Sequence, residues 1–366
     1  MHRTAVAERG GARGSPAAEA ARDIRELTLE ELESFVVATG ERAFRARQVM
    51  AWVWRRMAES FDVMSNLGAG FRHQLKNNFN IGETPRATVS RSDDGTRKLL
   101  VGLKDGEAIE TVVIPAGRRV TLCLSSQAGC AMACEFCATA RMGLHRNLSA
   151  ADILGQIAAA RRVLEPSEEL TNYVFMGMGE PLANYPRLAR ALGIMTSEWA
   201  MGISPRRITV STVGLVPGME RLLAEFPSVN LAVSLHATTD ELRDRLAPVN
   251  RRYPLSTLIG CCRRLPIKRR DRVTFEYVML AGINDSPADA HRLARLLRGL
   301  RAKVNLIFFN RFPGAPFTAS SRTAVEHFQA ILRQGNLTVT IRESRGQDIA
   351  AACGQLYAGR QSAHTV

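Results

Sequence analysis

The sequence predicts an α/β protein whose core is built from repeated β/α units. From about residue 119 onward, short apolar runs alternate with helical patterns, which is typical of parallel strands covered by helices. Upstream, the apolar residues follow a helical period up to residue 77 and a period of two from residue 87. This alternation is compatible with a partial barrel, a full eight-fold barrel or an open sheet.

A small helical region is expected first, with helices over residues 27–39, 44–57 and 67–77. A β meander should follow. Its two turn signals are Asp-Asp-Gly at 93–95 and Lys-Asp-Gly at 104–106, and both motifs favour tight hairpins.

The core should contain seven strands and six helical stretches. We expect strands at 120–124, 173–176, 208–211, 231–235, 273–279, 304–309 and 337–341. We expect helices at 150–163, 185–198, 218–225, 255–264, 287–297 and 323–333. The predicted organisation is a flexible tail (1–23), a helical accessory domain (24–84), a β meander or linker (85–115), the core (116–349) and a C-terminal loop and tail (350–366).

Composition favours a cytoplasmic protein that binds a polyanion. The 366 residues include 49 Lys and Arg against 35 Asp and Glu, giving a formal charge of +14 that attracts nucleic acid. Arginines recur at 251–252 and in the basic run 268–272, although such runs are often merely solvated. We find no apolar run long enough for a membrane helix and no secretory signal at the N-terminus. The odd number of cysteines, 7, argues against a disulfide-stapled secreted domain.

Three closely spaced cysteines are the strongest chemical signal. Cys130, Cys134 and Cys137 follow a C-x3-C-x2-C pattern and have no obvious fourth partner. Closed structural metal sites and ordinary iron–sulfur clusters use four protein ligands. Three thiolates would leave one metal with an open coordination position, where chemistry can occur.

Polar residues also follow several of the predicted strands, at the end where ligands bind in β/α folds. The motif Gly-Met-Gly-Glu-Pro at 177–181 places a flexible backbone and a carboxylate after the second strand. The other positions are Ser211, Ser234-Leu235-His236 and Asn310. Each alone is more often a cap or a loop hydrogen bond, but together they predict one pocket. No second metal-type ligand accompanies His236, so it is interpreted as pocket lining.

The cysteine spacing is the signature of radical S-adenosylmethionine enzymes, and the wider motif set resembles one family of them. From about residue 27 to residue 356 the chain resembles the dual-specificity RNA methyltransferases. The motifs that carry this resemblance lie at 109–115, 123–127, 130–137, 177–181, 234–236, 310–316 and 351–356. The resemblance implies a partial (β/α)6 radical S-adenosylmethionine barrel with a small N-terminal helical domain and a β-hairpin extension.

The resemblance also implies the cofactors. Cys130, Cys134 and Cys137 would hold a four-iron, four-sulfur cluster. S-adenosylmethionine would be bound by Gly179, Glu180, Ser211, Ser234, Leu235, His236 and Asn310. The implied reaction methylates C2 of adenosine in 23S ribosomal RNA, at the peptidyl transferase centre, and in transfer RNA, at the adenosine 3′ of the anticodon.

Two further cysteines and a glutamate have implied roles in that reaction. Cys353 would accept a methyl group from one S-adenosylmethionine, and a radical made from a second would convert that methyl to a carbon radical that adds to C2. Glu110 would be the proton acceptor. Cys123 would release the RNA by forming a transient disulfide with Cys353. Without the resemblance, a lone Cys353 is more often a small packing residue, and Glu110 reads as a solvated charge in an exposed strand.

Two alternative functions remain open at this point. One is the related C8-adenosine methyltransferase of 23S ribosomal RNA that confers antibiotic resistance. The other is a non-catalytic iron–sulfur protein that binds RNA. The expected partners are 23S ribosomal RNA, transfer RNA and an electron donor such as flavodoxin, with no membrane and a monomeric state.

Overall fold

The computed structural model describes residues 22–267 and 271–357. The expected tail therefore lies outside the described residues up to position 21. Residues 268–270 of the basic run and residues 358–366 of the expected C-terminal tail also lie outside them. None of the described helices is long and apolar enough to cross a membrane.

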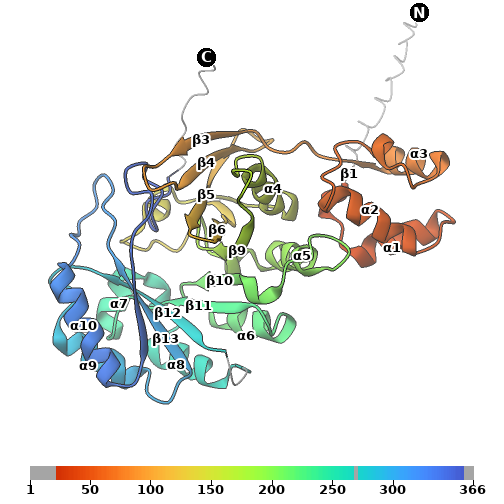
Figure 1. Ribbon diagram of the computed structural model, residues 1–366. Helices are drawn as coiled ribbons and strands as arrows, with labels where there is room; N and C mark the ends of the chain where they lie inside the picture. The colour runs from red at the N-terminus through yellow and green to blue at the C-terminus, as the bar shows by residue number, and fades with distance from the viewer. Residues whose placement is uncertain (1–21, 268–270, 358–366) are drawn as a thin grey trace, which may run out of the picture.

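A ten-stranded mixed sheet organises the chain, in the order β14-β13-β12-β11-β10-β9-β6-β5-β4-β3 (Figure 1). Seven neighbouring strands run parallel, which confirms all the expected core strands. They are β6 (Arg119–Cys123), β9 (Leu170–Phe175), β10 (Ile208–Thr212), β11 (Asn230–Ser234), β12 (Val273–Met279), β13 (Ala302–Phe308) and β14 (Thr338–Arg342). Within the described residues β14 and β3 are the unpaired edges, so the sheet is an open partial barrel and not a closed eight-fold one.

Helices follow the strands as the apolar periodicity predicted. They are α4 (Ala150–Arg161), α5 (Tyr185–Thr196), α6 (Val216–Glu225), α7 (Asp240–Leu246), α8 (Leu255–Arg264), α9 (Pro287–Leu296) and α10 (Arg322–Gln334). Helix α7 was not expected, because its seven residues are mostly charged and show no apolar stripe. Short 3₁₀ turns occur at η1 (Ile24–Glu26), η2 (Phe61–Val63), η3 (Thr139–Met142), η4 (Pro181–Asn184), η5 (Pro205–Arg207) and η6 (Pro248–Arg251).

The expected meander is present, but it extends the main sheet and does not merely link two domains. Its strands are β3 (Ala87–Arg91), β4 (Arg97–Gly102) and β5 (Ala108–Ala116), and β5 pairs antiparallel with β6. Helix α4 packs against β4 and β5. The meander is therefore covered on one face, and its strands can hold buried functional groups.

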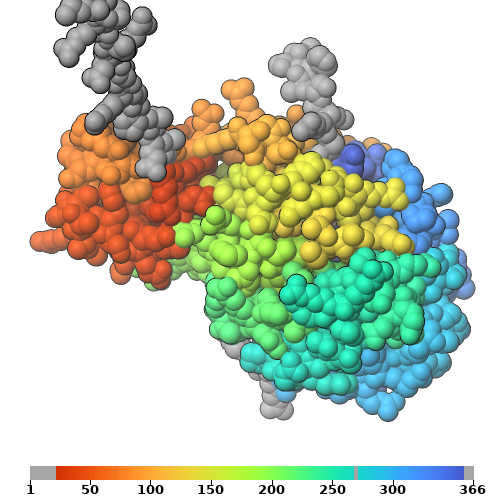
Figure 2. All heavy atoms as spheres, turned by 180° about the vertical axis from the view of Figure 1, so that it is seen from behind, coloured from red at the N-terminus to blue at the C-terminus, as the bar shows by residue number. Residues whose placement is uncertain are grey.

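The N-terminal helices form a lobe beside the barrel (Figure 2). They are α1 (Leu29–Ala38), α2 (Phe44–Trp54) and α3 (Ala69–Asn78), and the short strands β1 (Arg22–Asp23) and β2 (Phe79–Asn80) pair next to them. Thr28 caps α1 in a capping box with Glu31, which fixes where the helix begins. The expected second helix is shorter than predicted, ending at Trp54.

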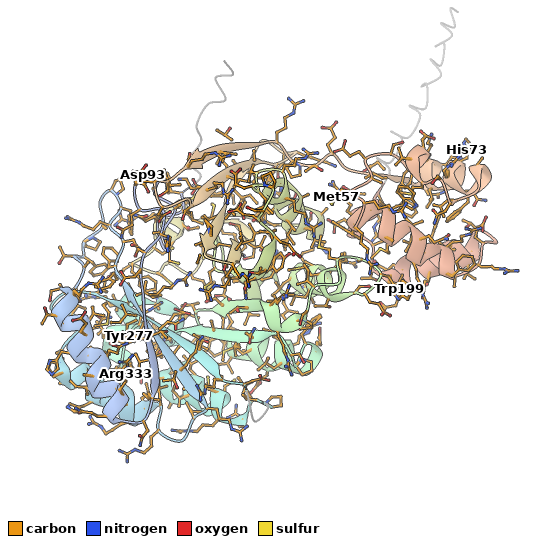
Figure 3. The ribbon with its side chains drawn as sticks, in the orientation of Figure 1. Met57, His73, Asp93, Trp199, Tyr277 and Arg333 are labelled. Atoms are coloured by element: carbon orange, nitrogen blue, oxygen red, sulfur yellow. The ribbon has the colours of Figure 1, made fainter. Side chains whose placement is uncertain are left out.

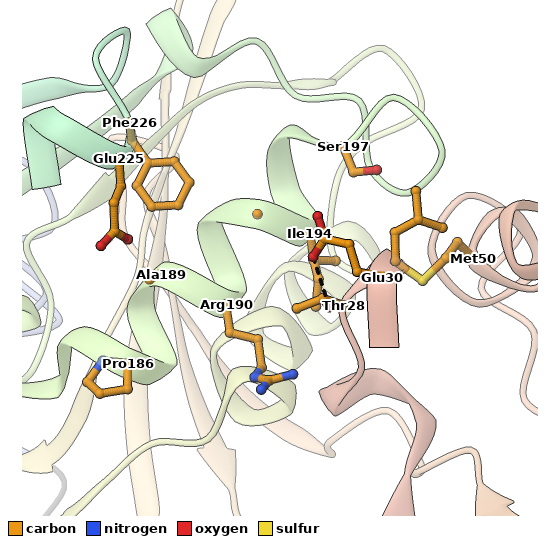
Figure 4. Close-up of a pocket in the computed structure, with 12 residues that line it drawn as sticks. Thr28, Glu30, Met50, Pro186, Ala189, Arg190, Ile194, Ser197, Glu225 and Phe226 are labelled. Carbon is orange, nitrogen blue, oxygen red and sulfur yellow. Dashed lines mark hydrogen bonds between the residues drawn. The ribbon is translucent and has the colours of Figure 1, made fainter. Parts of the chain in front are cut away.

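Polar contacts join the lobe to the barrel. Arg190 of α5 donates a 2.9 Å hydrogen bond to Glu31 and holds the pKa of that carboxyl at about 2. Arg47 of α2 lies 4.9 Å from the ring centroid of Trp199, which Figure 3 labels at this seam. A cavity of about 450 Å³ opens between α1 and α5 (Figure 4). None of the residues predicted to be functional lines that cavity.

Candidate functional site

The three cysteines lie on a loop enclosed by a small hairpin. Strands β7 (Gln127–Gly129) and β8 (Leu144–Asn147) pair antiparallel, and the cysteine loop connects them. This hairpin was not among the expected strands. The Cys130 amide donates to the Gly143 carbonyl at 2.7 Å and closes the base of the loop. Gly129 has φ +74° and approaches Gly143 so closely that a side chain there would collide with it.

The three thiols lie close enough to influence one another's charge. Burial is the main cause that raises the pKa of Cys130 to about 12, and the neighbouring Cys137 and Glu180 contribute to the same rise. Burial is also the main cause that raises the pKa of Cys134, and the nearby thiols of Cys137 and then Cys130 raise it as well. Cys130 is buried and Cys134 and Cys137 are partly buried, and three such thiols that disfavour one another's charge require a cation before they can all become thiolates.

This donor set fits an iron–sulfur cluster. As placed, no group of three or more His, Cys, Asp or Glu side chains in residues 22–267 and 271–357 could hold a single metal ion. A four-iron cluster is wider than one ion, so its three cysteines must stand further apart than the ligands of a mononuclear site. Soft sulfur donors without accompanying oxygen ligands are the set that such clusters use.

Neighbouring elements hold the cysteine loop in place. The Glu135 amide donates to the Leu246 carbonyl at the end of α7 (3.1 Å). The Phe136 ring meets the His236 ring edge-on, with centroids 4.3 Å apart. The loop is therefore fixed both by α7 and by the residues that follow β11.

Glu180 is a buried acceptor behind the cysteine loop. One carboxylate oxygen accepts from the Leu182 amide (3.0 Å) and the other from the Val213 amide (2.8 Å). Burial raises the pKa of Glu180 to about 7, although these hydrogen bonds act in the opposite direction. The position of Glu180, which the sequence predicts as an ammonium acceptor, is thus set by the residues that follow β9 and β10.

Gly179 needs to be glycine, and its replacement should destabilise the fold. It has φ +97°, and an added Cβ would lie 2.5 Å from the Gln127 Cβ. We expect Gly179→Ala to lower the free energy of unfolding by about 1–3 kcal/mol, the scale of one strained backbone position, in a denaturant titration. Gly193→Ala is the matched control, because Gly193 lies within α5 and an added Cβ there meets nothing within 4 Å. The control should be neutral or slightly stabilising. Equal effects for the two variants would contradict this role for Gly179.

The remaining predicted pocket residues lie at the ends of β10 and β11. Ser211 is buried in β10, Ser234 ends β11, and Leu235 is fully buried directly after it. His236 adopts φ +59°, and its Nδ1 accepts from the Val278 amide at 3.0 Å. Burial, and then Arg243, lower the pKa of His236 to about 3, so the ring is neutral. A neutral, backbone-bonded ring agrees with its interpretation as pocket lining.

Arg243 is a site residue that the sequence reasoning missed. It lies on the unpredicted α7, and its guanidinium donates to the carbonyls of Val213 and Leu235. It thereby ties the ends of β10 and β11 together. The sequence of α7 is mostly charged, so no pattern in it distinguishes Arg243 from the many other arginines of the chain.

Cys353 is brought to this site from the far end of the chain. The Cys353 carbonyl accepts from the side-chain amide of Asn310 at 3.1 Å. The carbonyl of the following Gly354 accepts from the backbone amide of Ala138, next to the cysteine triplet, at 2.7 Å. Cys353 raises the pKa of both Cys137 and Cys123, so its thiol lies near both of them. In this arrangement Asn310 positions the Cys353 loop.

Cys123, at the end of β6, is deeply buried and is a neutral thiol. Burial and then Cys353 raise its pKa to about 12, while Arg342 lowers it. All cysteines of the described residues are free, so Cys123 and Cys353 are not joined in a disulfide.

Glu110 is buried, which corrects the expectation of an exposed strand. Its exposed fraction is 4%, because β5 lies inside the sheet and under α4. Lys98 pairs with one carboxylate oxygen at 2.8 Å, and the Tyr357 amide donates to the other at 2.8 Å. Cys123 is opposite Val112 in the β5–β6 register, and residues two apart share a face, so Glu110 and Cys123 face the same side.

The meander also holds the C-terminal loop that carries Cys353. Lys98 reaches the Ala350 carbonyl at 3.4 Å. The Asp93 amide, labelled in Figure 3 at the β3–β4 turn, donates to Asp348 at 3.3 Å. Glu110, its cationic partner and the Cys353 loop therefore form one connected unit.

Comparisons with known proteins agree with this arrangement. Residues 22–81 match the ribosomal RNA large subunit methyltransferase N-terminal domain, and residues 124–294 match the radical SAM superfamily. The chain is similar to the dual-specificity RNA methyltransferase RlmN of Pelobacter propionicus, with 50% identity covering 91% of this chain and 95% of that protein. The corresponding protein of Anaeromyxobacter dehalogenans is 50% identical, covering 92% of each chain. A radical SAM methyltransferase from Sphaerobacter thermophilus has a similar structure, with TM-score 0.85, 47% identity and coverage of 92% of this chain and 100% of that one.

Proposed function

The chain belongs to the dual-specificity RNA methyltransferase RlmN family, and we propose that it methylates C2 of adenosine in 23S ribosomal RNA and in transfer RNA. One observation carries the proposal beyond the family. The residue after Cys353, Gly354, is hydrogen-bonded to Ala138 beside the triplet, and the Cys353 thiol is close enough to both Cys137 and Cys123 to raise their pKa values. A non-catalytic cluster protein would have no need for that placement.

The proposed cofactors are a four-iron, four-sulfur cluster and S-adenosylmethionine. Cys130, Cys134 and Cys137 would hold the cluster, and Glu180 would accept hydrogen bonds from the amino group of S-adenosylmethionine. The remaining contacts to S-adenosylmethionine would come from Gly179, Ser211, Ser234, Leu235, His236 and Asn310. When bound, the two cofactors together supply the one-electron chemistry that makes a carbon radical.

The residues around Cys353 supply the rest of the reaction. Its sulfur would take a methyl group, losing the thiol proton and forming a carbon–sulfur bond. A carbon radical made from that methyl would add to C2 of the base, and the adduct would then lose one electron, which the bound cluster could accept, as Glu110 removes the C2 proton. Cys123, once deprotonated, would attack the Cys353 sulfur, so that a disulfide forms as the carbon–sulfur bond to the RNA breaks. The electron pair of that bond would pass to the departing carbon, which would take up a proton and become the methyl group of the product. The buried Cys123 must lose its proton in this step, and the positive Arg342 favours that loss.

The charge of +14 favours RNA as the substrate class. We propose that the N-terminal lobe and the basic surface engage folded RNA through shape and phosphate contacts, while one adenosine is flipped into the barrel. An electron donor such as flavodoxin, a monomeric state and a cytoplasmic location complete the proposal.

A reconstituted reaction tests the proposed function against the non-catalytic alternative. The full chain would be loaded with cluster anaerobically and mixed with S-adenosylmethionine, a reductant and RNA. We expect 5′-deoxyadenosine and S-adenosylhomocysteine to form together with methylated RNA. A loaded protein that binds RNA but forms neither product would be a binding protein and not a methyltransferase.

A further inference from the structure

Arg243 is a fully buried cation, and within residues 22–267 and 271–357 all its direct hydrogen-bond acceptors are uncharged. Its exposed fraction is 0%. It donates to the Val213 carbonyl at 2.6 Å, the Leu235 carbonyl at 3.2 Å and Asn250 Oδ1 at 3.0 Å. Burying a charge without an opposite charge beside it is costly, commonly by several kcal/mol per ion. A neutral hydrogen-bond donor could also bind the carbonyls at the strand ends, so the charge of Arg243 needs a separate explanation.

Asp240 and Asp244 stabilise the charge of Arg243 electrostatically, but within the described residues they are linked to it by hydrogen bonds only through Asn250. Asn250 Nδ2 donates to Asp240 at 2.9 Å and to Asp244 at 2.7 Å, while its oxygen faces Arg243. Burial lowers the pKa of Arg243 to about 10, so the guanidinium still carries its charge at neutral pH. A persistent, weakly compensated positive charge is therefore built into this end of the barrel.

That charge lies against the cysteine loop. Helix α7 carries Arg243 and ends at Leu246, whose carbonyl accepts from Glu135 inside the loop at 3.1 Å. Leu235, which Arg243 binds, precedes His236, whose ring contacts Phe136 of the same loop. Among neighbouring charges, Cys134 has the largest stabilising effect on the charged form of Arg243.

We propose that Arg243 tunes the iron–sulfur cluster electrostatically, favouring its reduced state and so raising its reduction potential. The inference rests on the proposed function, which places the cluster on Cys130, Cys134 and Cys137. Reduction adds an electron to a centre already surrounded by thiolates, and a nearby buried cation stabilises the added charge. Water screens a buried pair of charges far less than an exposed pair.

Replacing the charge tests the proposal directly. The reduction potential of the reconstituted full-length chain would be measured by a redox titration followed by electron paramagnetic resonance. For Arg243→Gln we expect the equilibrium constant for reduction to fall about tenfold, which is about 59 mV more negative for one electron. Arg243→Lys keeps the charge and should keep a potential near that of the unmodified chain, even if its altered hydrogen bonds lower the melting temperature.

Arg245 provides a matched control on the same helix. It lies 3.6 Å from Glu135 of the cysteine loop, but 51% of its side chain is exposed. Solvent screens such a charge, so Arg245→Gln should shift the reduction equilibrium by less than half as much as Arg243→Gln. Asp244→Asn should shift the potential upward, because it removes compensating negative charge and keeps an oxygen that can accept from Asn250.

The outcomes separate the inference from the proposed function. Iron and sulfide analysis of the unmodified chain comes first, and a chain that binds no cluster would refute both. If the cluster forms and Arg243→Gln leaves the potential unchanged, or Arg245→Gln shifts it equally, the tuning role is wrong. If Arg243→Gln does not fold or load, Asp244→Asn decides: an upward shift supports the role and an unchanged potential overturns it.

Discussion

Cys123→Ala should leave the enzyme covalently joined to its RNA. The variant retains the cluster cysteines, Cys353 and Glu110, so the carbon–carbon bond to the base still forms. It lacks the sulfur that would attack Cys353, and we assign no other thiol to that role. Incubation with S-adenosylmethionine, reductant and RNA should convert much of the protein to a slowly migrating adduct on a denaturing gel, while methylated product falls to a trace.

Cys262→Ala is the control for this experiment. Cys262 is buried in α8, as Cys123 is buried in β6, and burial also raises its pKa to about 12. Removing its thiol tests the general cost of a buried cysteine-to-alanine change. The control should turn over without forming an adduct. A Cys123→Ala enzyme that also turns over normally and leaves no adduct would refute the resolving role.

Cys353→Ala should abolish methylation, by on the order of 10⁴-fold or more, the scale of losing a covalent nucleophile. The loop should survive the change, because hydrogen bonds to main-chain groups anchor it next to residue 353: Asn310 binds the residue-353 carbonyl and Ala138 binds the Gly354 carbonyl. Mass spectrometry of the intact protein should find no methylated cysteine at this position, and RNA analysis should find no product.

The double variant Cys123→Ala, Cys353→Ala links the two predictions. If the adduct forms through Cys353, then removing both thiols must abolish it. An adduct of undiminished yield in the double variant would place the RNA attachment elsewhere in the chain. Residual methylation by Cys353→Ala at more than a few per cent of the normal rate would equally contradict a covalent role.

Much of the fold could be predicted from apolar periodicity. All seven parallel strands were expected, because each is a short apolar run between helical patterns. Periodicity could not decide how the sheet ends, since closure depends on pairings between residues far apart in sequence. It also missed α7, whose charged residues carry no apolar stripe, and the hairpin around the cysteine loop, whose strands are only three and four residues long.

Part of the candidate site could likewise be predicted from the sequence, and part could not. The cysteine triplet can be recognised locally, since the spacing of its own residues indicates the chemistry. The roles assigned to Cys123, Cys353 and Glu110 came from the family resemblance and remain proposals. The burial of Glu110 depends on α4 and on the sheet continuing through β6, which alternation within one strand cannot show. Arg243 could be singled out only in the three-dimensional structure, because what distinguishes it is that none of its direct hydrogen-bond acceptors in the described part of the chain is charged.

The central claim is methylation at C2 of adenosine, and nucleoside mass spectrometry tests it most directly. Ribosomal and transfer RNA would be compared from cells that lack the endogenous activity, with and without expression of this chain. We expect 2-methyladenosine to appear in both RNA classes only when the chain is expressed. The appearance of 8-methyladenosine without the C2 isomer would contradict it and assign the chain to the C8-methylating relatives.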